Sequence, residues 1–88
     1  MPIDRRTALA NIAETLDILE LAITARDKSK AFEAVSILLM QFLQGFIDDN
    51  AAVGNTLPLL EQFKDRIVAG DFAEALSYTQ SFRAMFTN

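Results

Sequence analysis

The most apolar stretch of the chain covers residues 32–47, and its pattern predicts a helix. Helical residues advance by about 100°, so apolar residues three or four positions apart share a face. One face of this helix carries Val35, Leu38, Phe42 and Phe46. A second strip, well round the helix from the first, consists of Phe32, Leu39, Met40, Leu43 and Ile47. Because both strips are apolar, we expect this helix to be buried on two sides.

A first helix is predicted before this stretch, from residue 4 to about residue 25. Pro2, Ile3 and Asp4 are typical of a helix entrance, where Asp4 would cap the first free amides. Five residues alternate at spacings of three and four and form a packing seam: Leu9, Ile12, Leu16, Leu19 and Ile23. The predicted turn at 26–29 contains Asp27 and Ser29, both capping residue types, so the second helix should run from about Lys30 to Ile47.

The segment 51–55 is predicted as a loop, or as a frayed continuation of the second helix, with Gly54 and Asn55 as the break. Thr56 would then cap a third helix, whose first turn tolerates Pro58 because an N–H is not needed there. The buried side of this third helix would be formed by Leu60, Phe63 and Ile67.

The second predicted turn lies at 69–71. Gly70 suits the left-handed position after a helix, and Asp71 with Glu74 matches a capping pair for the next helix. The fourth helix would bury Phe72, Ala75, Leu76, Thr79, Phe82 and Phe86. Its opposite face consists of small residues and is expected to be solvated.

The two halves of the chain are similar. A shift of 41 residues aligns TLDILE (15–20) with TLPLLE (56–61), EAVS (33–36) with EALS (74–77), and the first predicted turn with the second. Duplication and two independent amphipathic hairpins both explain this match. Either way, the sequence predicts an all-α, four-helix antiparallel bundle built from two similar helical hairpins. We expect a single domain over 1–88, with hairpins at 4–50 and 55–87.

Composition narrows the possible chemistry. A chain of 88 residues buries little core, and such small domains rely on disulfides, metals or oligomerisation. The sequence has neither cysteine nor histidine, which excludes disulfides, thiolate sites and the usual general base. Oligomerisation remains, and the 51% hydrophobic content is compatible with it.

The charge distribution argues against two classes of partner. The net charge is −4 and the basic residues occur as isolated pairs, whereas nucleic-acid binding needs a basic stripe. The apolar stretch 32–47 is shorter than the roughly 20 residues that span a bilayer, and the N-terminal residues do not resemble a signal peptide. We therefore expect a small acidic, cytoplasmic protein that binds neither nucleic acid nor membrane.

Polar clusters give no candidate active site. Each predicted helix carries one carboxylate of the set Glu20, Glu33, Glu61 and Glu74. A di-metal bundle would also need Glu-x-x-His ligands, so Glu33 and Glu74 are better explained as first-turn caps and the other two as solvated flanking charges. Asp48, Asp49 and Asn50 lack the spacing of an EF-hand loop. The sequence predicts no catalytic residues, no metal and no cofactor, and therefore no enzyme.

The second strip is the candidate functional site. Phe32, Leu39, Met40, Leu43 and Ile47 are predicted to contact another chain, in a homodimer or in a complex with a different protein. The alternative is that this helix is the innermost of the bundle and its neighbours cover both strips. The expected function is a non-catalytic helical interaction protein: an adaptor, an assembly or chaperone-like factor, or a regulatory subunit, which self-associates. Two alternatives are a carrier or sensor of an apolar ligand, and a small acidic immunity or inhibitor protein.

Overall fold

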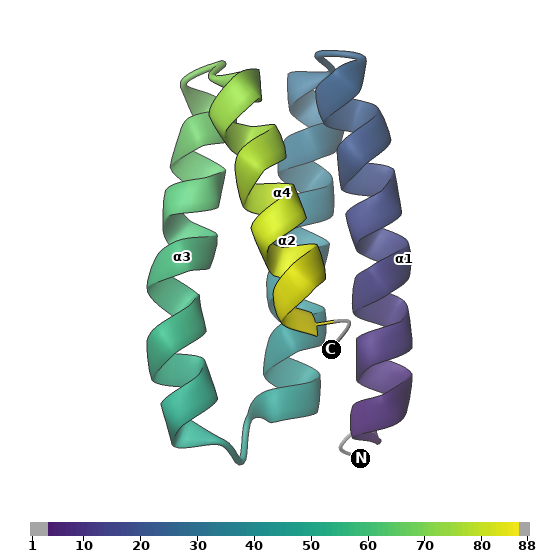
Figure 1. Cartoon of the computed structure of the whole chain (residues 1–88), viewed down its shortest axis with the longest axis vertical. Coiled ribbons are helices and arrows are strands. Elements are labelled where there is room, and N and C mark those ends of the chain that lie inside the picture. Colours follow the sequence, from purple (N-terminus) through teal and green to yellow (C-terminus); the bar gives the residue numbers. More distant parts are fainter. Residues whose placement is uncertain (1–3, 87–88) are drawn as a thin grey trace.

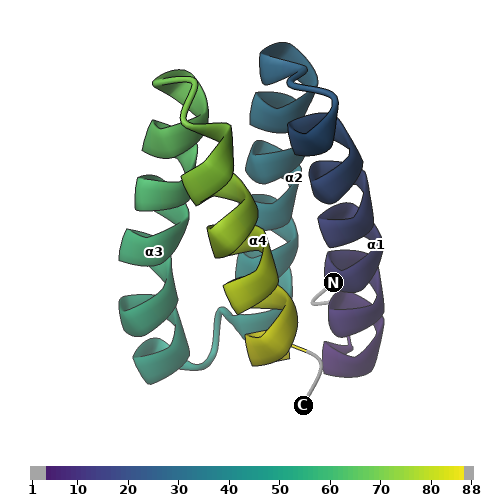
Figure 2. The same cartoon turned by 45° about the horizontal axis from the view of Figure 1, so that its top comes forward.

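The computed structural model of the chain describes residues 4–86, which contain four α-helices and no strand. These are α1 (Arg5–Thr24), α2 (Lys28–Phe46), α3 (Asn50–Val68) and α4 (Phe72–Phe86). Each helix packs against two neighbours: α1 and α3 both lie next to α2 and α4 (Figure 1). The helices run alternately up and down around one centre (Figure 2). The predicted all-α, four-helix antiparallel bundle is confirmed.

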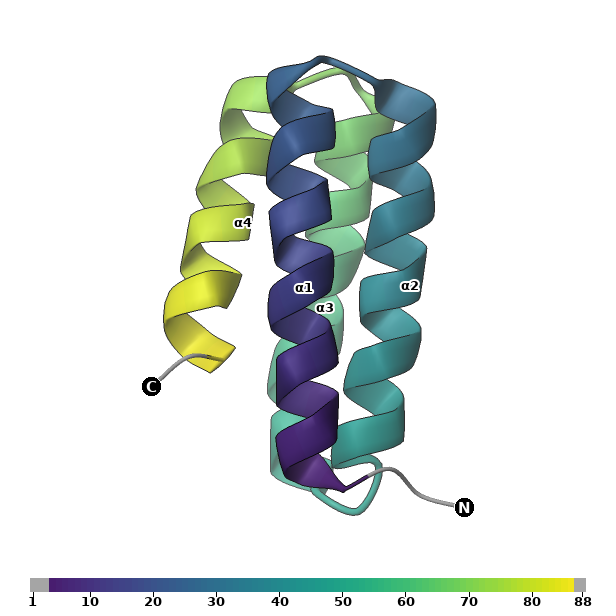
Figure 3. The same cartoon turned by 90° about the vertical axis from the view of Figure 1, so that its right-hand side faces the viewer.

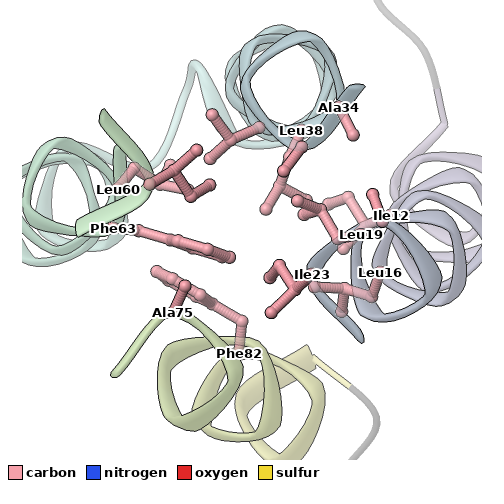
Figure 4. Close-up of a cluster of buried hydrophobic side chains, with 14 of the residues drawn as sticks. Ile12, Leu16, Leu19, Ile23, Ala34, Leu38, Leu60, Phe63, Ala75 and Phe82 are labelled. Carbon is pink, nitrogen blue, oxygen red and sulfur yellow. The ribbon is translucent and has the colours of Figure 1, made fainter. Parts of the chain in front are cut away.

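The core lies along the axis of the bundle and receives side chains from all four helices (Figure 4). Four residues of the predicted α1 seam are confirmed as buried, Ile12, Leu16, Leu19 and Ile23, whereas Leu9 is half-buried. Phe63 of α3 stacks on Phe82 of α4, with ring centroids 5.6 Å apart. The remaining large core residues are Val35, Leu38, Phe42, Leu60 and Ile67.

The predicted loop at 51–55 is wrong, because α3 already begins at Asn50. Asp49 is its N-cap, and the carboxylate of Asp49 accepts a hydrogen bond from the Ala52 N–H at 3.1 Å. Ala52 and Val53 then pack against the core, so burial favours helix over the break that Gly54 indicated. Thr56 is buried inside the helix and does not cap it.

Pro58 consequently lies in the interior of α3 rather than in its first turn. It has no N–H to donate to the carbonyl of Gly54. Both residues are solvent-exposed, so water can reach the carbonyl that loses its helical partner. Exposure of this position explains how the helix continues through a proline.

The helix caps agree with most of the predictions. The Asp27 carboxylate accepts from the Lys30 N–H at 3.1 Å, so α2 starts at Lys28, two residues before the predicted Lys30. Gly70 has φ of 77°, and the Asp71 carboxylate accepts from the Glu74 N–H at 3.2 Å, which confirms the second turn. Asp4 occupies the N-cap position of α1, but its side chain makes no capping hydrogen bond. Pro2 and Ile3 lie outside the described residues.

The structural repeat has a period of 44 residues rather than 41. In the two turns, the Asp27 N–H donates to the Ala22 carbonyl and the Asp71 N–H donates to the Arg66 carbonyl, each at 2.9 Å and 44 positions apart. At this spacing, buried residues match buried residues in seven pairs: Ile12/Thr56, Leu16/Leu60, Leu19/Phe63, Ile23/Ile67, Ala31/Ala75, Val35/Thr79 and Leu38/Phe82. The 41-residue alignment is therefore displaced by three positions, and it places residues of the first turn on the end of α3. A displacement of three keeps nearly the same helix face, which is why it still matched apolar residues.

Gly45 has a structural role that the sequence pattern did not indicate. It is buried, and a Cβ added to it would overlap the Cβ of Ala8, so α1 approaches the backbone of α2 at this point. Further along, the Thr15 hydroxyl donates to the Gln41 side-chain oxygen at 2.7 Å. These contacts fix how α1 lies along α2, and thereby which side of α2 remains outside the bundle.

Candidate interaction surface

The second strip lies partly outside the bundle. Phe32, Met40 and Ile47 are 41%, 60% and 61% exposed. Leu39 and Leu43 are half-buried and pack against the core. Two of the five predicted residues, Leu39 and Leu43, therefore cover the core and are only partly accessible. The other three project from the surface.

The position of α2 in the bundle explains this exposure. It is a corner helix that contacts α1 on one side and α3 on the other, and it lies diagonally opposite α4 (Figures 1 and 3). A corner helix leaves its outward side to solvent. The alternative in which α2 is innermost, with both strips covered by its neighbours, is not the observed arrangement.

A groove between α2 and α3 adjoins the second strip. It has a volume of about 110 Å³ and is lined by Phe32, Val35, Ser36 and Leu39 of α2 and by Leu60, Glu61 and Lys64 of α3. The floor is apolar, and Glu61 and Lys64 place one charge of each sign at its edge. Sequence analysis did not predict the part of α3 in this groove, because the apolar pattern of a helix does not specify which helix packs against each of its faces.

The outward side of α2 is uncharged over most of its length. No charged residue occurs between positions 34 and 47. Ile37 is also an exposed apolar residue of this helix, although it is not part of the predicted second strip. Charges stand instead at the two ends, with Lys28, Lys30 and Glu33 in the first two turns of α2 and Asp48 and Asp49 just beyond its end. In contrast, α1 and α3 carry exposed acidic or basic side chains along much of their outward sides, for example Glu14 and Asp17 in α1 and Glu61 and Asp65 in α3.

A second cavity opens at the end of the bundle that holds the α2–α3 loop. Because α4 has 15 residues where its neighbours have 19 or 20, it stops short of that end (Figure 3). The space has a volume of about 280 Å³ and is called here the end cavity; it is lined by Arg5, Leu9, Phe42, Phe46, Ala52, Thr56, Met85 and Phe86.

The end cavity has one cationic group at its wall. The guanidinium of Arg5 lies over the ring of Phe46, 4.6 Å from its centroid, and contacts a carboxylate oxygen of Asp48 at 2.9 Å. Phe46 stacks in turn on Phe42, with ring centroids 5.1 Å apart. The cavity therefore offers aromatic faces, with a positive charge already paired to an acidic side chain.

The four glutamates that the sequence placed one on each helix do not share a site. Glu20 and Asp17 of α1 both contact Arg83 of α4, at 3.1 and 2.9 Å, so Glu20 holds two helices together and is more than a flanking charge. Glu33 lies beyond the first turn of α2, which corrects its assignment as a first-turn cap, whereas Glu74 does lie in the first turn of α4. Among residues 4–86, no three acidic side chains are grouped in a way that could hold a metal ion.

Within the same described range, the helices are too short or too polar to cross a bilayer. Comparisons of the chain with protein-family models, with curated proteins and with solved structures give no match.

Proposed function

We propose that this protein is a non-catalytic helical interaction protein that self-associates through the second strip on α2. The observation that carries the proposal is the exposure of Phe32, Met40 and Ile47 on a helix that has no charged residue from 34 to 47, beside an apolar groove. Grouped apolar side chains at a surface mark interaction sites, and flexible methionine adapts to a partner. Interface centres are likewise depleted in charge, as this helix is.

Clustering distinguishes this surface from ordinary exposed apolar residues. Leu21 of α1 is 73% exposed, more than any residue of the second strip, but the outward side of α1 also carries Glu14 and Asp17. Ile18, three positions before Leu21, is also 46% exposed, but these two residues have charged neighbours, and small exposed apolar patches of this kind are common in monomers. Leu21 therefore provides a matched control for any substitution made on α2.

The test is to replace Met40 and Ile47 by Asp and to measure the mass in solution by light scattering coupled to size exclusion. We expect the native protein to be a dimer at low micromolar concentration, and Met40→Asp/Ile47→Asp to be a monomer with native helicity by circular dichroism. Both side chains are mostly exposed, so the change should leave the core intact. Leu43 is unsuitable because it also packs on the core.

Leu21→Asp introduces the same charge elsewhere and should remain a dimer. A native protein that is monomeric across the whole concentration range would reject self-association. A Met40→Asp/Ile47→Asp variant that stays dimeric would place the interface on another surface.

The end cavity favours a second candidate function, a carrier or sensor of an apolar ligand. Its volume of about 280 Å³ and its lining of Phe42, Phe46 and Phe86 are suited to a small apolar molecule. Mass spectrometry of an organic extract of the purified protein tests this directly. A ligand that copurifies with the native protein and is lost from Ala52→Leu, which would narrow the cavity, supports the carrier; an empty extract rejects it.

A further inference from the structure

We propose that two copies pair through the second strip with their α2 helices antiparallel, so that the Ile47 end of each helix covers the α2–α3 groove of the other. This inference rests on the proposed self-association, and it adds the direction of pairing and the groove as a receiving site. Two observations carry it: the shape of the two ends of the strip, and the charges that flank it.

The midpoint of the second strip falls between Leu39 and Met40, and Leu43 has the polar Ser36 as its counterpart on the other side of that point. Phe32 and Ile47 lie equally far from this midpoint. A two-fold interface uses the same surface on both copies, and in an antiparallel pair each end of the strip meets the opposite end of its copy. Phe32 would therefore lie near Ile47 of the second copy, and the middle residues would meet each other at the axis.

The two ends of the strip differ in shape. At the Phe32 end, the surface is hollowed by the α2–α3 groove, whose volume is about 110 Å³. At the other end, Ile47 projects with 61% of its surface exposed, and Met40, near the middle of the strip, is 60% exposed. Antiparallel pairing places a projecting end on a hollow end twice, whereas parallel pairing would place two hollow ends together and two projecting ends together.

The flanking charges favour the same direction. Lys28 and Lys30 are exposed at the start of α2, where they outnumber the exposed Glu33, and Asp49 and Asp48 follow its end; the side chain of Asp48 is 78% exposed although it pairs with Arg5. A parallel pair would bring lysines beside lysines and aspartates beside aspartates, which is unfavourable. An antiparallel pair brings each lysine end to an aspartate end of the second copy, so the charges are complementary.

Cross-linking between introduced cysteines tests the direction, because the chain has no cysteine of its own. Glu33 and Gln44 are both exposed on α2, and eleven positions, about three turns, put them on the same side of the helix. In the antiparallel pair, residue 33 of one copy lies within about 3 Å of residue 44 of the other along the helix axis, whereas two residues 33 lie about 20 Å apart.

The experiment mixes Glu33→Cys with a mass-tagged Gln44→Cys protein, allows the copies to exchange, and adds a short bismaleimide. We expect the mixed dimer as the main cross-linked product, with little product when Glu33→Cys is present alone. The same pair carrying Met40→Asp and Ile47→Asp should lose the mixed product, which shows that cross-linking depends on the strip.

A native dimer in which Glu33→Cys cross-links to itself would overturn antiparallel pairing and leave the proposed self-association intact. A native protein that is monomeric by light scattering and gives no cross-link would reject both. The mixed product alone supports the proposed direction.

Discussion

The two hairpins of this bundle have equivalent buried positions but close in different ways. In the α1–α2 hairpin, small residues let the helices approach, with Gly45 against Ala8 and with Ala31 and Ala34 buried between them. In the α3–α4 hairpin, rings hold the helices apart, since Phe63 stacks on both Tyr78 and Phe82 at centroid distances of 5.8 and 5.6 Å.

The difference shows that the buried pattern alone does not set the distance between helices. Leu19 and Phe63 occupy equivalent positions 44 residues apart, as do Leu38 and Phe82, yet one hairpin has aliphatic side chains and the other has rings. Because small residues allow close approach in the first hairpin, α2 packs closely against α1. The ring-spaced second hairpin ends early and leaves the end cavity open.

The largest expected effect comes from removing a ring of the second hairpin. Phe82→Ala should lower the free energy of unfolding by about 3–5 kcal/mol, because it leaves a cavity and deletes stacking with Phe63 and Phe86. The equivalent Leu38→Ala should cost about 2–4 kcal/mol. Urea unfolding followed by circular dichroism measures both, in the Met40→Asp/Ile47→Asp background so that dimerisation does not contribute. If Leu38→Ala were the more harmful by a clear margin, the rings would not be the main contact of the second hairpin.

A smaller change in stability is expected at the close contact of the first hairpin, where adding a methyl group should destabilise the protein although the same change elsewhere in a helix stabilises it. Gly45→Ala should destabilise the protein by about 1–3 kcal/mol, because its Cβ would overlap that of Ala8. The exposed Gly54 has nothing within 4 Å of an added Cβ, so Gly54→Ala should instead stabilise by about 0.5–1 kcal/mol through helix propensity.

Ala8→Gly should recover most of the loss in the double variant with Gly45→Ala, since it removes the overlapping group. Thermal unfolding of the four variants measures this coupling. An unchanged or raised stability in Gly45→Ala alone would show that α1 and α2 can separate at no cost.

The smallest effects are expected at the two equivalent turns, where Arg26 has φ of 56° and Gly70 has φ of 77°. A non-glycine residue in this left-handed region costs roughly 1 kcal/mol. Arg26→Gly should therefore stabilise the first hairpin and Gly70→Ala should destabilise the second, each by about 1 kcal/mol. Chemical unfolding curves of the two variants should shift in opposite directions, and shifts of the same sign would mean that the turns are not equivalent.

The existence of four helices, the inward face of each, and the first and third of the three turns could be predicted from sequence alone. These follow from local rules, because a period of 3.6 residues, an aspartate cap and a glycine at positive φ act within a few residues of one another. The same local rules failed at α3, where Gly54 and Asn55 indicated a break. There, burial of Ala52 and Val53 against distant helices outweighed the local preference.

The sequence also identified the second strip, but it could not divide that strip into its parts. Whether Leu39 covers the core while Met40 faces solvent depends on how far α3 lies from α2, and no local pattern contains that distance. Packing between helices also creates the groove lined by Leu60 and Phe32, and it sets the 44-residue register of the two hairpins. These features depend on tertiary packing, which brings together side chains that are far apart in the chain. The apolar pattern of one helix does not specify which helix packs against it.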